Sequence, residues 1–174
     1  MGVAREGAAA ALLPCGKVAV AGGFDGSRGG VLKTAVLWDP ATGAWSDLPP
    51  MAQERDGAGC CVLPSGRVAV VGGNGIDYAS RNDGEAFDPV AQTWQPLPPM
   101  AHARSHHGVV AVAGGLLAVS GRADYGPDEL FDEASGRWFA LPHPMAQPRT
   151  RARLVTVPAA ALAQPAGAAA AANA

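Results

Sequence analysis

The chain of 174 residues is long enough for one domain with a buried core, and 48% of its residues are hydrophobic. Its 23 glycines and 15 prolines favour many turns over long helices. The formal net charge of −2 gives no electrostatic reason to expect binding to nucleic acid or to an anionic membrane. We therefore expect a turn-rich globular protein whose partners include neither nucleic acid nor membrane.

Cysteine usage indicates a reducing compartment. The three cysteines, Cys15, Cys60 and Cys61, cannot all pair within the chain, and no C-x-x-C spacing occurs. Cys60 and Cys61 fall in an apolar stretch and are expected to be buried and inert. The short apolar run after Glu6 is interpreted as a strand rather than a signal peptide. The predicted location is cytoplasmic.

The first predicted unit, residues 5–53, consists of four short strands in succession. Small apolar residues in "GAAAALL" predict the first strand, and a glycine-bearing turn leads to the second, "VAVAGG". The third strand ends at the first aromatic residue of "WDPATGAW", where Asp and Pro favour a turn. The fourth strand carries the second tryptophan of that motif and ends at Pro-Pro.

Two further copies follow at constant offsets, over residues 54–102 and 103–147. The aspartate of the motif recurs as Asp39, Asp88 and Asp132, and a tryptophan follows each by six residues. Arginine lies four residues after the methionine of "PPMAQER", "PPMAHAR" and "HPMAQPR". A glycine lies eleven residues after Arg5, Arg55 and Arg104, at Gly16, Gly66 and Gly115. In the third copy, Ser120-Gly121 replaces a glycine doublet and Glu133 replaces a proline.

Four-stranded units with a period of 44 to 49 residues favour radial repetition, the β-propeller, over a sandwich. The aromatic residues Trp38, Phe87 and Phe131, with the tryptophans that follow them, are then expected to pack between blades. The repeated arginines Arg55, Arg104 and Arg149 are expected to hold strands or loops together rather than to contact a ligand.

These residues together resemble the kelch repeat: a glycine doublet ending a strand, aromatic-Asp-Pro, tryptophan, Pro-Met and arginine. The resemblance covers about residues 5 to 157 and implies an all-β fold of kelch-type propeller blades, with a degenerate third repeat. It does not define the function, because kelch propellers include ligase adaptors, actin-binding proteins and several enzymes.

Three units form an incomplete or open ring, since propellers typically have four to eight blades. Residues 148–157, "PRTRARLVTV", are predicted to begin a fourth blade as a spare first strand. Residues 158–174 form an alanine-rich, low-complexity tail. Three explanations stay open: a homodimer completing a six-bladed ring, a fragment of a longer kelch protein, and an open arc protected by its tail or a partner.

The candidate partner-binding residues follow from the resemblance. In kelch-type adaptors of cullin ubiquitin ligases, partner contacts come mainly from the loop after the glycine doublet and the loop after the repeat arginine. These loops also differ most between the copies, as expected of binding residues on a rigid scaffold. The first loop gives Phe24, Asp25, Ser27, Arg28, Asn74, Asp77, Tyr78, Arg81, Asn82, Arg122, Asp124 and Tyr125. The second loop gives Asp56, Ser105, His106, Thr150 and Arg151.

Metal sites and catalysis have weaker support. His102 and His106 are four residues apart, a spacing that aligns two ligands only in a helix, and Pro98-Pro99 argues against one. The kelch-fold oxidases that resemble galactose oxidase hold copper with tyrosine and histidine, yet Tyr78 and Tyr125 are the only tyrosines of this sequence. We expect no metal, cofactor or catalytic residue.

The leading hypothesis is a non-enzymatic kelch-repeat module that binds a protein or peptide through its loop face. Substrate recognition for a ubiquitin ligase is the specific role that the resemblance favours, although no F-box or BTB segment is recognised in the sequence. The alternative is a fragment or degenerate relative of a kelch-fold enzyme, galactose-oxidase-like or a sugar isomerase.

Overall fold

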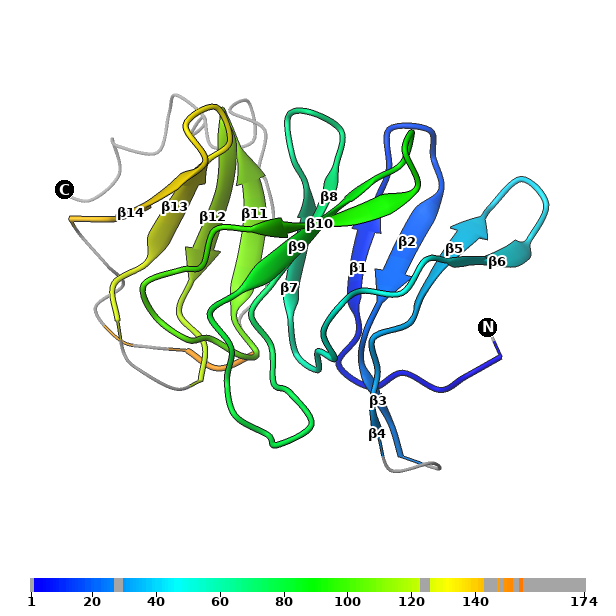
Figure 1. Ribbon diagram of the computed structural model, residues 1–174, viewed down its shortest axis with the longest axis horizontal. Coiled ribbons are helices and arrows are strands. Elements are labelled where there is room, and N and C mark those ends of the chain that lie inside the picture. The colour runs from blue at the N-terminus through cyan, green and yellow to red at the C-terminus, as the bar shows by residue number, and fades with distance from the viewer. Residues whose placement is uncertain are drawn as a thin grey trace, which may run out of the picture.

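The computed structural model describes residues 2–26, 30–122, 126–142, 147, 149–151 and 154. These residues form three four-stranded antiparallel sheets and one two-stranded ribbon (Figure 1). No helix occurs among them, and therefore none that could span a membrane. The prediction of three all-β blades is confirmed.

Each sheet has its four strands in sequence order. Blade 1 comprises β1 (Ala9–Leu12), β2 (Val18–Ala21), β5 (Ala35–Asp39) and β6 (Ala44–Leu48). Blade 2 comprises β7 (Gly59–Val62), β8 (Val68–Val71), β9 (Gly84–Asp88) and β10 (Thr93–Leu97). Blade 3 comprises β11 (Gly108–Val112), β12 (Gly115–Val119), β13 (Glu129–Asp132) and β14 (Arg137–Ala140). The ribbon of β3 (Phe24–Asp25) and β4 (Gly30–Val31), which the sequence did not predict, lies in the β2–β5 connection.

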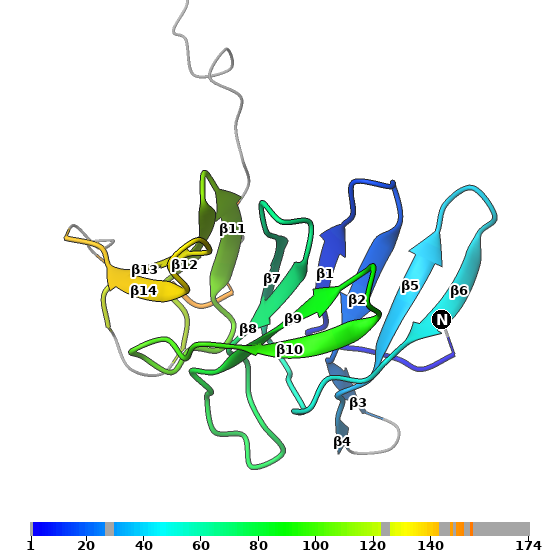
Figure 2. The ribbon, with the colours of Figure 1, turned by 45° about the horizontal axis from the view of Figure 1, so that its top comes forward.

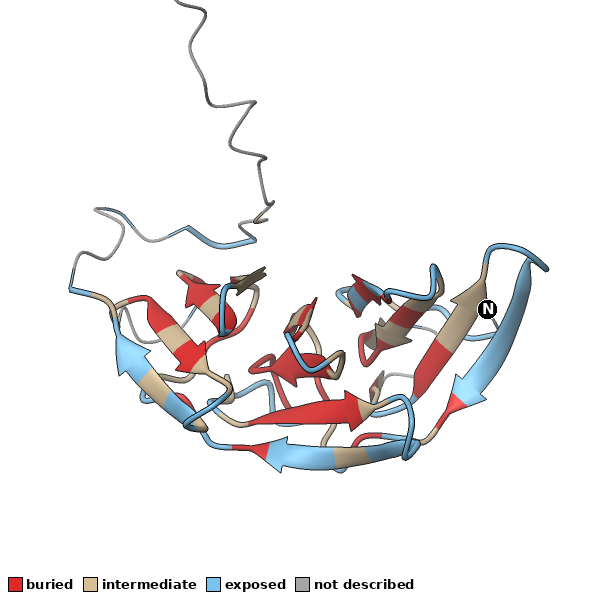
Figure 3. Ribbon diagram, turned by 90° about the horizontal axis from the view of Figure 1, so that it is seen from above, coloured by how far each residue is buried: buried red, intermediate tan, exposed pale blue. Residues whose placement is uncertain are grey.

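The blades fan out side by side (Figure 2). The first strands lie innermost, with β7 packed between β1 and β11, and the fourth strands form the outer rim (Figure 3). Figure 3 also shows that the described residues form an arc and do not close a ring.

The hydrophobic core is divided into two clusters, one at each joint between blades. In both, one blade contributes mainly alanine, leucine and methionine side chains, and the next contributes a valine or leucine together with an aromatic ring. The joint of blades 1 and 2 buries Ala9, Ala11, Leu13, Ala19, Ala21, Ala35, Leu48, Met51, Val68, Val70 and Phe87. The joint of blades 2 and 3 buries Cys61, Leu63, Ala69, Val71, Ala86, Leu97, Met100, Leu116, Ala118 and Phe131. Packing of blade on blade therefore holds the arc together.

The repeated aromatics of blades 2 and 3 lie between blades, as predicted. Phe87 pairs with Trp94 across β9 and β10, with ring centroids 5.2 Å apart. Phe131 and Trp138 show the same pairing across β13 and β14 at 5.2 Å. The indole N–H of Trp94 donates to the Pro49 carbonyl at 2.7 Å, so each aromatic pair is also tied to the preceding blade.

The prediction is wrong for blade 1. Trp38 is only half-buried, and Trp45 opposite it is 39% exposed. Their rings are 6.3 Å apart. Among the described residues no blade precedes β1, so this pair has nothing to pack against on its outward side.

The repeated arginines hold connections together, as predicted for Arg55 and Arg104. The buried Arg55 guanidinium donates to the Gly72 carbonyl at 3.0 Å and pairs with the carboxylates of Asp83 and Glu85 at 3.0 and 3.2 Å. Arg104 repeats this arrangement with the Ser120 carbonyl at 2.9 Å and Glu129 at 3.1 Å, and it also contacts the Pro127 carbonyl. Each arginine thus ties the start of its blade to the connection between that blade's second and third strands.

The third copy keeps the backbone of the first two despite its sequence changes. Ser120 and Gly121 have φ of 61° and 109°, the left-handed conformations of the doublets in the other blades. The residue equivalent to Gly16 and Gly66, with φ of 84° and 87°, is Gly114 at 84° rather than Gly115. Four residues separate the cross-strand pair Ala111 and Leu116, whereas five separate the equivalent pair Leu12 and Val18 of blade 1. The constant offset of eleven from arginine to turn glycine is therefore wrong for blade 3, where it is ten.

Candidate binding site

Four backbone turns of one conformation lie at the inner ends of the blades. We call them the arches: residues 5–7, 55–57, 104–106 and 149–151, each beginning with a repeat arginine. The third residue of every arch is left-handed, with φ of 63° at Gly7, 63° at Gly57, 53° at His106 and 59° at Arg151.

Backbone hydrogen bonds connect the arches in series. The Gly57 N–H donates to the Gly7 carbonyl at 3.0 Å, and the His106 N–H donates to the Gly57 carbonyl at 2.7 Å. The Arg151 N–H continues the series to the His106 carbonyl at 2.7 Å. The arches therefore form one continuous ladder around the axis of the arc.

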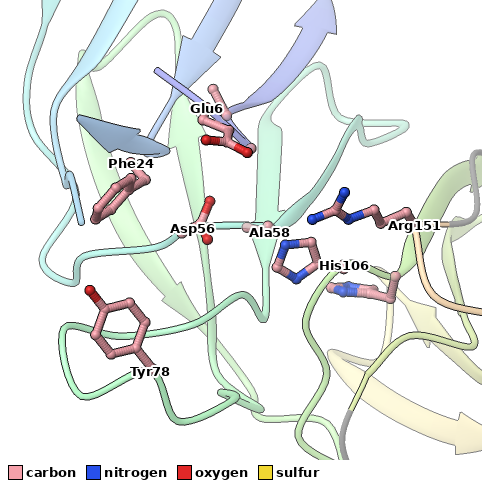
Figure 4. A pocket seen from close by; sticks show the side chains of 11 residues that line it. Glu6, Phe24, Asp56, Ala58, Tyr78, His106 and Arg151 are labelled. Carbon is pink, nitrogen blue, oxygen red and sulfur yellow. The ribbon is translucent and has the colours of Figure 1, made fainter. Parts of the chain in front are cut away.

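A pocket of about 430 Å³ opens beside this ladder. Figure 4 shows the Asp56 carboxylate between two groups of side chains, the aromatic Phe24 and Tyr78 on one side and the basic His106 and Arg151 on the other. Gly7, Ala8, Gly57 and Ala58 line it with backbone and small side chains, and Glu6 and His107 complete the wall. The pocket thus combines acidic, basic and aromatic groups within one ligand-sized space.

Two of the four arches carry side chains where glycine would be free of strain. His106 and Arg151 adopt the left-handed conformation that costs L-residues with a Cβ about 1–2 kcal/mol. The His106 ring packs directly over Gly57, where an added Cβ would lie 2.7 Å from it. Strained residues of this kind cluster at functional sites, which makes His106 and Arg151 the first candidates for ligand contact.

Burial shifts the pKa of two groups that line the pocket, Asp56 and His107. Burial raises the pKa of Asp56, while the charge of His106 opposes this rise and that of Glu6 adds to it. His107 is only 6% exposed, and burial, together with Arg104 and His106, lowers its pKa to about 3. Neither ring nitrogen of His107 has a hydrogen-bond partner among the described residues. Both nitrogens are buried, so this neutral imidazole forms part of the pocket wall without presenting its donor or acceptor to a ligand.

The structure brings five of the predicted binding residues into this pocket: Phe24, Asp56, Tyr78, His106 and Arg151. Three others lie in the interior, namely Asp25, Asn74 and Ser105. The Ser80 hydroxyl joins the last two, since it lies 3.3 Å from the Asn74 amide oxygen and 2.9 Å from the Ser105 hydroxyl. These three side chains support loops, and we leave them out of the proposed site.

The remaining predicted residues lie outside the pocket. Arg81 forms a two-point ion pair with Asp83 at 2.8 and 2.9 Å, and Asn82 donates to the Met100 carbonyl at 3.0 Å. Asp77 accepts the Ala79 N–H at 3.1 Å, and the exposed Arg122 pairs through its backbone with Ser105. Thr150 is exposed, and Ser27, Arg28, Asp124 and Tyr125 lie outside the described residues.

Sequence reasoning missed Glu6 and His107. Glu6 occupies the middle of the first arch, as Asp56 does in the second, so counting the arches in register would have found it. His107 was not among the predicted binding residues. Its role depends on close packing against Gly59 and Gly72, where an added Cβ would lie within 3 Å of the imidazole.

The cysteines and the remaining histidines do not form a reactive or metal-binding site among the described residues. Cys61 is buried and Cys60 is partly buried. Burial raises the pKa of the Cys60 thiol and raises that of Cys61 to about 12, which disfavours the reactive thiolate at both. His102 lies 3.4 Å from Glu129. No three His, Cys, Asp or Glu side chains converge as metal ligands among the described residues, and His143 lies outside them.

Comparison with known proteins shows which repeat family the blades are similar to. Residues 8–52 match the family model of the kelch motif. Blade 1 is a kelch repeat. Blades 2 and 3 follow it in strand order, aromatic pairs and buried arginines, so the three sheets are blades of the kelch type.

A solved structure titled "Structure of YjhT" is similar to the chain, with a TM-score of 0.70 at 20% identity. The match covers 84% of this chain and 54% of YjhT, so the chain spans about half the length of that protein. Identity this low shows the fold alone. No match was found among the curated proteins.

Proposed function

We propose that this chain is a protein-interaction module that binds a partner peptide in the pocket beside the arches. The observation that carries the proposal is the placement of His106 at a strained backbone position in the pocket that Asp56 and the aromatic rings of Phe24 and Tyr78 also line. Tyr78 is 68% exposed at the pocket mouth, and tyrosine is a common hot-spot residue in interfaces.

The His106→Gly substitution tests this role without harming the fold. Glycine already occupies the same arch position at Gly7 and Gly57, so the variant removes the side chain and relieves backbone strain. Peptides selected by display on the wild-type chain should bind His106→Gly and Tyr78→Ala about tenfold or more weakly in a fluorescence-anisotropy titration, a loss of about 1.4 kcal/mol.

Val90→Ala is the matched control. Val90 is 92% exposed in the β9–β10 turn, which belongs to the opposite loop face. The Val90→Ala variant should bind the selected peptides with the affinity of the wild type. Unchanged affinity in His106→Gly and Tyr78→Ala, with both variants folded by circular dichroism, would reject the pocket as the binding site.

Substrate recognition for a cytoplasmic ubiquitin ligase remains the specific form of this proposal. It is supported by the kelch motif and by the loop-built site, and it requires a ligase component outside the described residues. Co-purification of a defined cullin adaptor with the chain is the direct measurement.

One observation favours the alternative, a relative of a kelch-fold enzyme. The raised pKa of Asp56, beside His106, suits a carboxyl group that exchanges protons with a ligand. If the chain is a sugar isomerase, it should accelerate isomerisation of a reducing sugar followed by NMR, and Asp56→Asn should abolish the acceleration. If the chain accelerates isomerisation of none of the sugars in a panel, the isomerase alternative is rejected and the interaction role stands.

A further inference from the structure

Blade 1 exposes a face that is buried twice elsewhere in the chain. We call the row of residues that a blade turns toward the preceding blade its aromatic face. Cross-strand pairing defines it as Val62, Val68, Phe87 and Trp94 in blade 2, and as Ala111, Leu116, Phe131 and Trp138 in blade 3. Its counterpart in blade 1 is Leu12, Val18, Trp38 and Trp45.

The difference in exposure between these rows is large. Phe87 and Phe131 are each 2% exposed because the preceding blade covers them. In blade 1, Leu12 is 67% and Trp45 is 39% exposed. A surface made of one leucine, one valine and two tryptophans is typical of an interface rather than of a face in contact with solvent.

Blade 3 exposes the opposite half of the same joint. We call the row that a blade turns toward the next blade its receiving face, formed in blade 3 by Val110, Leu117, Leu130 and Phe139. The counterparts, Ala11, Ala19, Leu37 and Ser46 in blade 1 and Cys61, Ala69, Ala86 and Gln95 in blade 2, each receive an aromatic face. Phe139 is 47% exposed where the other blades have Ser46 and Gln95. The uncovered receiving face is thus more apolar than the two covered ones.

We propose that a second copy of this chain covers both faces, head to tail. The aromatic face of each copy packs on the receiving face of the other, so that two copies close a six-bladed ring with twofold symmetry. Two copies of this chain would also approach the length of YjhT, since 84% of this chain corresponds to 54% of that chain. The faces that carry ring closure are distinct from the residues that line the pocket, although closure would also displace Arg151 from it.

The internal joints predict a specific contact between the copies. Trp94 and Trp138 donate to the carbonyls of Pro49 and Pro98, which follow the last residues of β6 and β10. Pro142 has the same place after Leu141, so Trp45 should donate to the Pro142 carbonyl of the second copy. Blade 1 has Val36 where Glu85 and Glu129 accept backbone N–H groups of the preceding blade. The joint between copies therefore lacks this polar clamp and should dissociate more readily than the internal joints.

In the closed ring, the second copy's arch 5–7 would replace the arch 149–151 on blade 3. The arch 149–151 sits where the second copy's arch 5–7 belongs, held by hydrogen bonds from Gly121 to the Arg149 carbonyl and from Arg151 to the His106 carbonyl. The second copy's arch would accept from Gly121 and donate to His106 in the same way. The exchange conserves these hydrogen bonds, so burial of the two apolar faces decides the outcome.

Mass measurement on the full chain is the primary test. Multi-angle light scattering should give twice the chain mass of 17.5 kDa, with a dimer fraction that falls on dilution. Leu12→Asp and Phe139→Asp should each weaken the dimer by about tenfold or more, because each places a carboxylate in a joint. The matched control Val90→Asp, at an exposed valine outside both faces, should leave the mass unchanged.

Mixing the two variants distinguishes head-to-tail closure from other dimers. Leu12→Asp chains keep an intact receiving face and Phe139→Asp chains keep an intact aromatic face, so the mixture should regain part of the dimer that neither forms alone. A monodisperse wild-type monomer would overturn the proposal whatever the variants do. So would a dimer that both substitutions leave intact, or open-ended polymers in place of a closed pair.

Discussion

At the scale of single residues, the repeats share backbone conformations more strictly than they share sequence. The turn between the last two strands of each blade contains a left-handed residue four positions after the motif aspartate. This residue is Gly43 in blade 1 with φ of 69°, Gly136 in blade 3 with φ of 64°, and Gln92 in blade 2 with φ of 55°. Only glycine adopts this conformation without strain, so blade 2 carries a cost that the other blades avoid.

Gln92→Gly should stabilise the protein. The gain from relieved strain, at most about 1 kcal/mol, is reduced by loss of the hydrogen bond from the Gln92 amide to the Pro89 carbonyl and by the larger entropy of an unfolded glycine. Urea denaturation should show a higher midpoint with an unchanged slope. A lower midpoint would mean that the Gln92 side chain stabilises the turn by more than the strain costs.

Glu133 shows that a departure from a repeat can be a gain rather than decay. It replaces the turn proline of the other copies, and its carboxylate accepts the Ser65 N–H at 3.1 Å, the Ser65 hydroxyl at 2.5 Å and the Arg67 guanidinium at 2.8 Å. Burial raises the pKa of Glu133, but these hydrogen bonds outweigh it and hold the pKa below its ordinary value. The residue therefore links blade 3 to the β7–β8 turn of blade 2.

At the scale of elements, buried ion pairs hold the chain segments that connect one blade to the next, which the apolar clusters between blades do not hold. Glu85 accepts the Ala52 N–H at 2.7 Å and the Gln53 N–H at 3.2 Å, while it also pairs with Arg55. Glu129 does the same for Ala101 and His102. One glutamate in each of blades 2 and 3 thus binds the chain segment that leaves the preceding blade, and its charge is satisfied by the arginine that begins its own blade.

Asp83 should make stability depend on acid pH. Burial raises its pKa, but hydrogen bonds from Arg81 and Arg55 more than compensate, so the folded-state pKa lies well below its ordinary value. The stabilising effect is complete above the unfolded-state pKa of about 4 and is lost as the pH falls toward the folded-state value.

Asp83→Asn should therefore lower the free energy of unfolding by about 1–2 kcal/mol at neutral pH. As the pH falls below about 4 toward the folded-state pKa of Asp83, the free energies of unfolding of the variant and the wild type should converge progressively. Urea denaturation at several pH values measures both effects. Asp77→Asn, at an exposed carboxylate in the same loop, is the control and should change neither. Parallel wild-type and Asp83→Asn profiles from neutral to acid pH would contradict the assignment.

At the scale of the whole molecule, the chain is a series of identical joints with unlike ends. Each internal joint combines an apolar cluster, an indole hydrogen bond and a glutamate clamp. The two outer faces retain the apolar surface, yet blade 1 lacks the clamp because Val36 replaces the glutamate. Under the proposed ring closure, this asymmetry would make the contact between the ends reversible while the internal joints stay fixed.

The sequence by itself determined the blades. Residue types recur at fixed offsets, and side chains alternate across a strand, so the motif specified strand order, the aromatic pairs and the roles of Arg55 and Arg104. It failed for Trp38, because a repeat pattern does not say whether a neighbouring blade is present to cover its first member.

Only the tertiary structure decided which loop residues share a site. Asn74 and Asp56 belong to equally plausible loops, yet one side chain is buried and the other faces the pocket. Glu6, Asp56, His106 and Arg151 are spread over most of the chain and converge because hydrogen-bonded arches stack around one axis. That convergence depends on how blades pack against one another, a long-range geometry that local spacing does not contain.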